Sequence, residues 1–407
     1  MKTPVWVTAQ AQISAIGTTL NEFQSGLAAP ESRSQTIAIE IAGLDPKVLP
    51  VYACQYLDKT VSSPSKLPLD RSSALALGVV TQLLETSKLD LDHLDRSRLG
   101  VYWGCGMSGA ISLDAAMKSL YADKRRIRPT SVVTSMPNAP AAEISLLLRA
   151  NGPCLTYATA CASSAVAIGE AMLAIASGRV DIAIVGGSES MLSPGVMASW
   201  DALRVLAQVD GNADVVFRPF DLHRAGFVLG EGAAALILET PEHALRHGRV
   251  PVAALTGYAT NCDGYHMTNP HSPSQSIAMR SALDEAGLMP ADIGYINAHG
   301  TGTIAGDMSE AESIASVFGN RSVPVSSTKS MHGHLLGGGG AVELMVALNV
   351  LKTGLAPHTV NLHEQDPKFE LDLIYKQPRA VSQIRHAMSN SFAFGGTNAV
   401  LIASKID

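Results

Sequence analysis

The 407-residue sequence predicts an α/β fold built from two related halves, and three observations indicate it. Strand-like segments alternate with helical patterns, which is typical of α/β proteins. The composition is 46% hydrophobic and 16% charged, enough for one large core or two fused cores. A strand, a glycine-rich turn and an apolar helix occur once in each half, as CASSAVAIGEAM and GHLLGGGGAVELM. We expect halves at residues 1–245 and 246–407, divided near the charged segment ETPEHALRHGRVP.

The expected elements are short strands rich in Val, Ile, Leu and Tyr, and helices with regularly spaced apolar residues. The strands are expected at residues 99–104, 155–158, 181–185, 233–238, 252–258, 295–297, 323–326 and 399–402. The clearest helices are expected at residues 163–178, 274–287 and 340–354, each closed by a glycine. The first and third of these are almost wholly apolar, so we expect both to be buried between layers.

Charge and cysteine content narrow the function. The net charge of -6 argues against bulk nucleic-acid binding. Five scattered cysteines without CxxC pairs favour free thiols in a reducing compartment. The N-terminus has no pattern of a signal peptide, and every apolar run is too short for a membrane span. We therefore expect a cytoplasmic enzyme.

Cys161 lies where the strand-like run PCLTYATA meets a helix that begins ASSAVAIG. Free cysteine is among the most buried residue types, so a structural thiol is one interpretation. A cysteine at a helix N-terminus, however, feels the positive end of the helix dipole, which favours the nucleophilic thiolate. The small flanking residues leave room for a substrate, which a structural thiol does not need. The pattern therefore favours a nucleophile.

The segment INAHGTGTIAGD places His299 after a short strand and before a loop of glycines and threonines. A histidine in this position is often structural. The small residues, however, let a ligand approach the backbone, and the hydroxyls of Thr301 and Thr303 suit a polar substrate arm. We therefore expect a substrate-binding loop here.

Lys329 and Glu343 flank the glycine-rich turn in SSTKSMHGHLLGGGGAVELM. A buried lysine without a partner is costly, so we expect an ion pair between these two residues that orients His334. The HxH pair, His332 and His334, is also typical of metal ligands. No nearby carboxylate or cysteine completes a ligand set, so we expect no metal.

The segment SNSFAFGGTNAVLI ends in a strand preceded by a Phe-x-Phe-Gly-Gly turn. This turn suits an aromatic gate with a backbone N–H aimed at an oxyanion. An ordinary turn between two strands is the alternative.

Taken together, these segments resemble the β-ketoacyl-acyl-carrier-protein synthases of the elongating KAS I/KAS II type, in the thiolase-like superfamily. The similar motifs are TACASS, NAHGTGTxxGD, STKSMxGHLLG and NSFxFGGTN, together with RPFDxxRxGFVLGEGA at residues 218–233 and DGYHMTNP at residues 263–270. They occur in the family's order and span most of the chain.

The resemblance implies a thiolase-like fold of two pseudo-symmetric halves in a five-layer α-β-α-β-α arrangement, usually as a homodimer. It also implies roles for individual residues by their place in the motifs. Cys161 corresponds to the acyl-accepting nucleophile, His299 and His334 correspond to the histidines that promote decarboxylation, and Lys329 and Glu343 correspond to their supporting ion pair. Phe394 corresponds to the gate, and its N–H forms an oxyanion hole together with the N–H of Cys161. Residues that correspond to binding positions are Thr301, Thr303 and Met267 for the substrate arm and Met107 for the acyl pocket.

The implied reaction is that of a 3-oxoacyl-[acyl-carrier-protein] synthase. An acyl chain on Cys161 condenses with a malonyl unit that loses CO2, in fatty acid or polyketide/polyene biosynthesis. The implied partner is acyl carrier protein, whose phosphopantetheine arm carries the substrates, and no metal or other cofactor is implied. The basic run that contains Arg125 and Arg126 is either a contact for this acidic partner or a solvated loop.

The sequence departs from the family pattern in places. Ala393 stands where the gating turn usually has glycine, which narrows the backbone angles open to the turn, and GGGG at 337–340 replaces alanines. A non-catalytic chain-length factor, partner of a heterodimeric ketosynthase, is the main alternative, but such subunits generally lack the nucleophile. A thiolase would need a second catalytic cysteine late in the chain, and an initiating synthase would use Cys-His-Asn. Acyl-chain preference and pathway stay open.

Overall fold

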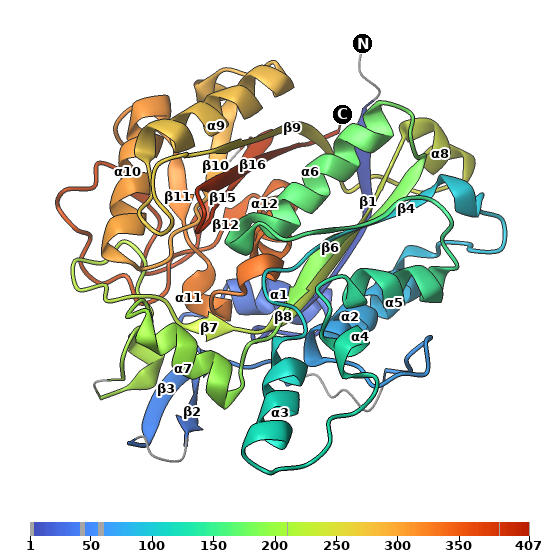
Figure 1. The fold of residues 1–407 in the computed structure, drawn as a ribbon. Coiled ribbons are helices and arrows are strands. Elements are labelled where there is room, and N and C mark those ends of the chain that lie inside the picture. Colours follow the sequence, from blue (N-terminus) through green and yellow to red (C-terminus); the bar gives the residue numbers. More distant parts are fainter. Residues whose placement is uncertain (1–3, 41–44, 56–60, 210, 382, 407) are drawn as a thin grey trace.

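The computed structural model describes residues 4–40, 45–55, 61–209, 211–381 and 383–406 (Figure 1). It is an α/β fold with one large sheet, as the sequence predicts. The strands are β1 (Val5–Ile13), β2 (Gln35–Ile39), β3 (Lys47–Tyr52), β4 (Leu99–Gly104), β5 (Cys154–Tyr157), β6 (Ile182–Glu189), β7 (Leu229–Gly230), β8 (Gly232–Glu239), β9 (Ala253–Cys262), β10 (Ile293–Asn297), β11 (Pro324–Ser326), β12 (Leu355–Ala356), β13 (Asp372–Leu373), β14 (Arg379–Ala380), β15 (His386–Phe392) and β16 (Thr397–Ser404). The helices are α1 (Leu20–Leu27), α2 (Arg71–Ser87), α3 (Ala110–Tyr121), α4 (Ser131–Ser135), α5 (Ala139–Leu148), α6 (Ser163–Ala176), α7 (Pro194–Ala202), α8 (Pro241–Arg246), α9 (Ser272–Ala286), α10 (Ile304–Phe318), α11 (Lys329–His332) and α12 (Gly339–Thr353).

The main sheet has two sets of five strands in the same order. From the centre outward, the first set runs β1-β8-β6-β4-β5 and the second runs β9-β16-β15-β10-β11, with β13 added at the far edge. In each set the two inner pairings are antiparallel and the two outer pairings are parallel. The two halves of the chain therefore repeat one topology, with α8 and the predicted dividing point at residue 245 between the two sets.

Strands β1 and β9 join the two sets. They pair antiparallel over three residues, from Val5↔Leu255 to Val7↔Ala253, so the ten strands and β13 form one continuous 11-stranded sheet. The two strand layers that the resemblance implies are therefore joined by one short ladder at the centre.

Helices lie between the two strand sets and on the outer side of each set, so helices and strands together form five layers. Helices α6 and α12 contact each other and lie between the two strand sets, while α2 packs on β1 and β8 and α9 packs on β9 and β16 (Figure 1). Every described residue of α12 from Gly339 to Leu351 is buried, which explains why the segment is almost wholly apolar. The expected central position of both helices is confirmed.

Two of the four glycines at 337–340, Gly337 and Gly340, pack closely against the first half of the chain, which the sequence did not indicate. A Cβ on Gly337 would lie 2.2 Å from the backbone nitrogen of Gly106, and one on Gly340 would lie 2.9 Å from the Cβ of Ala165. These glycines therefore let the start of α12 approach the first half of the chain, rather than merely loosening the start of the helix.

All eight expected strands and all three expected helices are present, with ends shifted by up to four residues. Sequence analysis missed β1 and the helices α2, α3, α5 and α10. It gave a turn between two strands as one interpretation of SNSFAFGGTNAVLI, and β15 does run directly into that turn. No helix among the described residues is long and apolar enough to cross a membrane.

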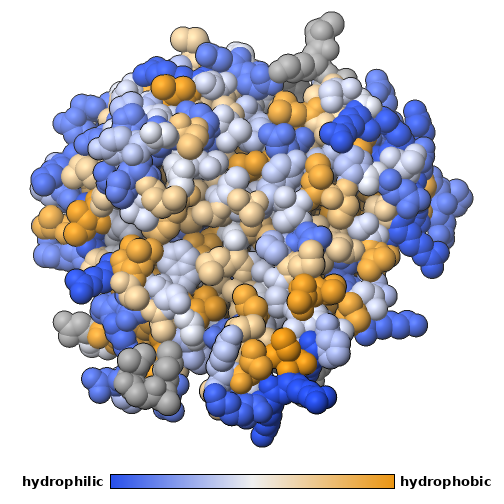
Figure 2. Space-filling view, viewed as in Figure 1, coloured by the Kyte–Doolittle hydropathy of each residue, from blue (hydrophilic) through white to orange (hydrophobic). Residues whose placement is uncertain are grey.

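Helix α3, like the short helix α4, buries little of itself. Only Ala116 is buried, and four large apolar side chains are exposed, namely Leu113, Met117, Leu120 and Tyr121. Figure 2 shows apolar side chains gathered over α3 and α4 in the lower part of the view. A patch of this kind on a folded chain typically marks an interaction surface.

Candidate active site

Cys161 lies on a single 3-10 turn, Ala160–Ala162, between β5 and the start of α6. Ala160 has a φ of +48°, an unfavourable value for a residue with a Cβ, so this turn is strained. The thiol is 6% exposed. Burial raises its pKa to about 12, although the charge of Lys329 and the backbone N–H groups of Phe394 and Cys161 act in the opposite direction.

The expectation that the helix N-terminus favours the thiolate of Cys161 leaves out the effect of burial. Desolvation of the buried sulfur outweighs the nearby positive charges, so the resting group is a neutral thiol. A proton acceptor is therefore needed at the sulfur when it reacts.

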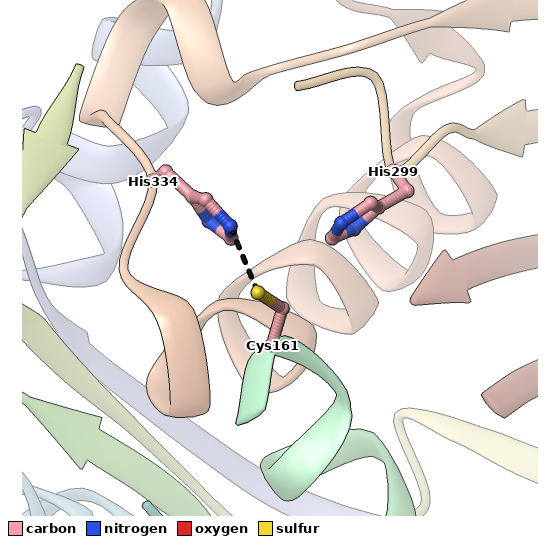
Figure 3. Close-up of side chains that lie close together, drawn as sticks. All are labelled: Cys161, His299 and His334. Atoms are coloured by element: carbon pink, nitrogen blue, oxygen red, sulfur yellow. Dashed lines mark hydrogen bonds between the residues drawn. The ribbon is translucent and has the colours of Figure 1, made fainter. Parts of the chain in front are cut away.

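His299 and His334 face this thiol from the second half of the chain (Figure 3). His334 Nε2 lies 3.2 Å from Cys161 Sγ, and the two imidazole rings are 5.5 Å apart, nearly perpendicular. Burial and the charge of Lys329 hold both histidine pKa values well below the usual range, so both rings are neutral. Two neutral imidazoles thus meet one neutral thiol.

The tautomer of each ring follows from what lies behind it. Lys329 Nζ lies 3.3 Å from His299 Nδ1, and the N–H of Leu336 donates to His334 Nδ1 over 3.3 Å. An ammonium group and a backbone N–H can only donate, so both Nδ1 atoms are acceptors. Both Nε2 atoms therefore carry the proton and act as donors toward the space above Cys161.

The expected ion pair between Lys329 and Glu343 is present, with both side chains 1% exposed. Burial raises the pKa of Glu343, and the lysine acts against that shift. The sequence-based expectation that this pair orients His334 is wrong. Lys329 begins the short helix α11, and its ammonium group contacts His299 instead, because the loop after β10 lies beside it.

A cavity of about 210 Å³ leads to these groups. Its lining includes Cys161, both histidines, Thr301, Thr303 and Met267, together with the turn at residues 393–396. Met267 is 71% exposed and lies at the mouth, whereas Cys161 lies deep. The arrangement is a narrow channel with a nucleophile and two hydrogen-bond donors at its base.

Comparisons with known proteins agree with this geometry. Sequence models described as the N-terminal and C-terminal domains of β-ketoacyl synthase match residues 2–244 and 252–363. The chain belongs to the β-ketoacyl synthase family. Nodulation protein E of Rhizobium leguminosarum bv. trifolii is 38% identical over 88% of this chain and 86% of its own length. 3-Oxoacyl-[acyl-carrier-protein] synthase 2 of Staphylococcus aureus is 37% identical over 83% of both chains.

Solved structures give the same result. The ishigamide ketosynthase/chain length factor superposes with a TM-score of 0.91 at 28% identity, over the full length of both chains. A β-ketoacyl synthase from Burkholderia phymatum superposes with a TM-score of 0.89 at 32% identity, again over both full lengths. The chain therefore has the thiolase-like fold and is a condensing enzyme of the acyltransferase class.

The remaining predicted residues of this β-ketoacyl synthase lie in different places. Thr301 and Thr303 meet, with their Oγ1 atoms 3.0 Å apart, and Thr303 Oγ1 also caps α10 by accepting the N–H of Gly306. Met107 does not line the cavity that reaches Cys161, and its side chain is 41% exposed near the start of α3. Arg125 and Arg126 are exposed on the loop that follows α3, also outside that cavity.

The ligand atoms of Cys161, His299 and His334 lie within 4.8 Å of one another, which is close enough to share a metal ion. Metal-bound histidine, however, normally donates its other N–H to an acceptor. In this β-ketoacyl synthase both Nδ1 atoms face donors instead, so binding through Nε2 would place N–H against N–H. His332 is occupied elsewhere, with its ring nitrogens at Gly333 O and Thr328 Oγ1.

Sequence analysis missed several residues that hold the site together. Glu310 accepts the N–H groups of His299 and Gly300, and burial raises its pKa to about 7. Asp307 accepts the N–H groups of Phe220 and Gly302. The sequence signal for Asp307 and Glu310 was their place in GDMSEAE, on the helix that follows His299. Acidic residues on a helix, however, are more often exposed.

Proposed function

We propose that this chain condenses an acyl group, held as a thioester on Cys161, with a malonyl unit delivered by acyl carrier protein. The products are a 3-oxoacyl-carrier protein and CO2. The observation that carries the proposal is the pair of Nε2–H donors converging with Cys161 Sγ at the base of the channel.

In the first step the sulfur of Cys161 attacks the acyl thioester and its proton goes directly to the departing pantetheine sulfur, while the Nε2–H of His334, 3.2 Å from Sγ, donates a hydrogen bond to the reacting sulfur. The backbone N–H groups of Cys161 and Phe394, which both point at the sulfur, form the oxyanion hole.

In the second step the malonyl C–C bond breaks, CO2 leaves, and the electron pair becomes an enolate. The Nε2–H groups of His299 and His334 donate to the enolate oxygen. The enolate carbon then attacks the acyl carbonyl, and the tetrahedral adduct expels the Cys161 thiolate, which takes up a proton. One such preorganised donor is worth about 2.7–4 kcal/mol of barrier.

Other residues have supporting roles in the proposal. Lys329 and Glu343 fix the tautomer of His299, Thr301 and Thr303 hold the pantetheine arm inside the channel, and Met267 contacts the arm at the mouth. Neither step needs a metal or another cofactor, and the donors behind both histidines support a metal-free site.

We also propose that the enzyme acts as a dimer, through the exposed apolar face of α3 and the open edge of β5. Related structures include a type II polyketide ketosynthase in complex with its acyl-carrier protein, and a ketosynthase in complex with its chain length factor. By the same reasoning Met107, beside α3, lines an acyl pocket completed by the partner subunit, and Arg125 and Arg126 contact the acidic carrier protein. No disulfide joins the cysteines of the described residues, which fits a cytoplasmic enzyme.

The test is to incubate the protein with acyl carrier proteins of several chain lengths plus malonyl carrier protein, and to detect 3-oxoacyl products by mass. The expected result is acylation of Cys161 followed by condensation, with the preferred acyl length separating fatty acid from polyketide substrates. A protein that is neither acylated nor able to release CO2 would instead be a chain-length-factor-like subunit. Cys161→Gln should stop condensation and leave CO2 release measurable.

A further inference from the structure

Trp200, on α7, stacks on the side chain that the proposed function assigns as the gate. The rings of Trp200 and Phe394 lie 6.3 Å apart at 23°. Residues 393–396 are hereafter called the gate turn. All of them except Gly395 line the channel beside Cys161, as does Phe392. We propose that Trp200 is a latch that holds the gate turn closed over Cys161, an inference that rests on the gating role of Phe394.

The stack belongs to a continuous row of aromatic rings. Trp200 also meets Phe227 edge-on at 5.8 Å, and Phe227 meets His334 edge-on at 5.1 Å. Offset and edge-on aromatic pairs stabilise contacts beyond their buried area. The row therefore links the gate turn to His334, and Trp200 is the ring that contacts both Phe394 and Phe227.

The two sides of the stack differ in how firmly they are held. Helix α7 is tied at both ends, because the N–H of Gly195 donates to Asp114 on α3 over 3.1 Å and Lys47 forms an ion pair with Asp201 at 2.6 Å. Trp200 is therefore a fixed support.

The gate turn, in contrast, is built to move. Gly395 and Gly396 have φ values of +83° and +81°, and Gly395 is exposed. The turn is held to the loop at 263–267 by two backbone hydrogen bonds, from Gly395 to Met267 and from Asp263 to Gly396, both of 2.8 Å. Ala393, the departure noted in the sequence, is part-buried between two core clusters and is a less mobile end of the turn.

The closed turn also places the Phe394 N–H at the Cys161 sulfur. The latch therefore has two effects at once, since it narrows access to the thiol and keeps an oxyanion donor in position. Removing the stack should raise the fraction of time in which Cys161 is open to reagents.

The experiment measures alkylation of Cys161 by iodoacetamide in the full-length protein, resolved by peptide mass. The variants are Trp200→Leu, which removes the ring, and Trp200→Phe, which keeps a stack. Trp6→Phe, on β1, is the matched control. An aromatic pair is worth about 0.5–1.5 kcal/mol, so Trp200→Leu should accelerate Cys161 alkylation by about 2- to 13-fold. Trp200→Phe and Trp6→Phe should stay within about 2-fold of wild type.

Two other cysteines are internal controls. Cys105 is buried away from the turn, and Cys154 is exposed on β5. A latch accelerates Cys161 alone, whereas general loosening of the fold would accelerate Cys105 as well and would overturn the proposal. An unchanged Cys161 rate in Trp200→Leu, or an equal rise in Trp200→Phe, would also overturn it. The assay needs no carrier protein, so its outcome is separate from whether condensation occurs.

Discussion

The loops that follow β4 and β10 occupy corresponding places in the two halves, yet only one of them carries chemistry. Glu189 accepts the N–H groups of Gly106 and Met107 after β4, just as Glu310 accepts those of His299 and Gly300 after β10. Burial raises the pKa of each glutamate to about 7. Each loop is thus held by one buried glutamate, although Glu189 ends β6 and Glu310 lies on α10.

What differs is the side chains that the two halves supply. The second half supplies His299 and His334, which face the thiol, and the Lys329–Glu343 pair behind His299. The first half supplies one neutral cysteine. The comparison teaches that topology determines where a residue lies, whereas the groups around it determine its reactivity. Four experiments test this distinction.

The largest effect is expected for Cys161→Ala. Removing a nucleophile that acts with its partners as a unit should lower condensation by about 10⁴-fold or more, with no acyl-enzyme detected by mass. Cys105→Ala is the matched control, because Cys105 is equally buried in the loop after β4 but faces no histidine. Loss of condensation in both variants would contradict the assignment.

The second experiment follows the alkylation of Cys161 with pH. Because burial raises the pKa of this thiol to about 12, the thiolate fraction should grow about tenfold per pH unit, or about 10³-fold from pH 7 to pH 10. Iodoacetamide rates resolved by peptide mass check this. If the alkylation rate stops rising near pH 8, the groups of the second half already hold Cys161 as a thiolate.

The third experiment removes the charge that the second half contributes. Lys329→Met takes away the donor behind His299 and should slow CO2 release from malonyl carrier protein by about 10²–10³-fold. It also leaves Glu343 buried and unpaired, a loss of about 3–5 kcal/mol of stability.

The double variant Lys329→Met/Glu343→Leu separates these two effects. It should recover most of the melting temperature, because no unpaired charge stays buried, while CO2 release stays slow. Recovery of both quantities would show that the pair acts on stability alone. Arg379→Met, which breaks a more exposed ion pair with Asp372, serves as the control.

The smallest effect is expected from the two corresponding glutamates. Glu310→Gln weakens the hold on His299 and should slow CO2 release by about tenfold, whereas Glu189→Gln should change it by less than about twofold. Equal effects on CO2 release would remove the contrast between the two loops.

Combining the two substitutions tests the pH dependence of stability. Both carboxyls have a folded-state pKa above the unfolded value, so the folded chain keeps a proton that the unfolded chain loses between about pH 4.5 and pH 7. Their contribution to stability should therefore fall as pH rises through that range. Urea unfolding of wild type and the double glutamine variant, compared at pH 5 and pH 7, checks the sign.

Much of the site followed from the sequence, because Cys161, His299, Lys329 and His334 each stand in a distinctive local motif. The predictions that failed depended on contacts between segments that are distant in the sequence. Lys329 is near His334 in sequence but reaches His299 in space, and the depth of Cys161 cancels the effect of its helix end. Trp200 had no local signal at all, since its role comes from a ring almost two hundred positions later.

The pairing of β1 with both β8 and β9 has a consequence for how the chain folds. Val7 pairs with Leu238 on one side and Ala253 on the other, each more than two hundred residues later in the chain. The centre of the sheet therefore cannot close until some 250 residues have left the ribosome, and contacts of such long range slow folding. Until then β1 has two open edges, so the nascent first half is the stage at which this protein is most exposed to aggregation.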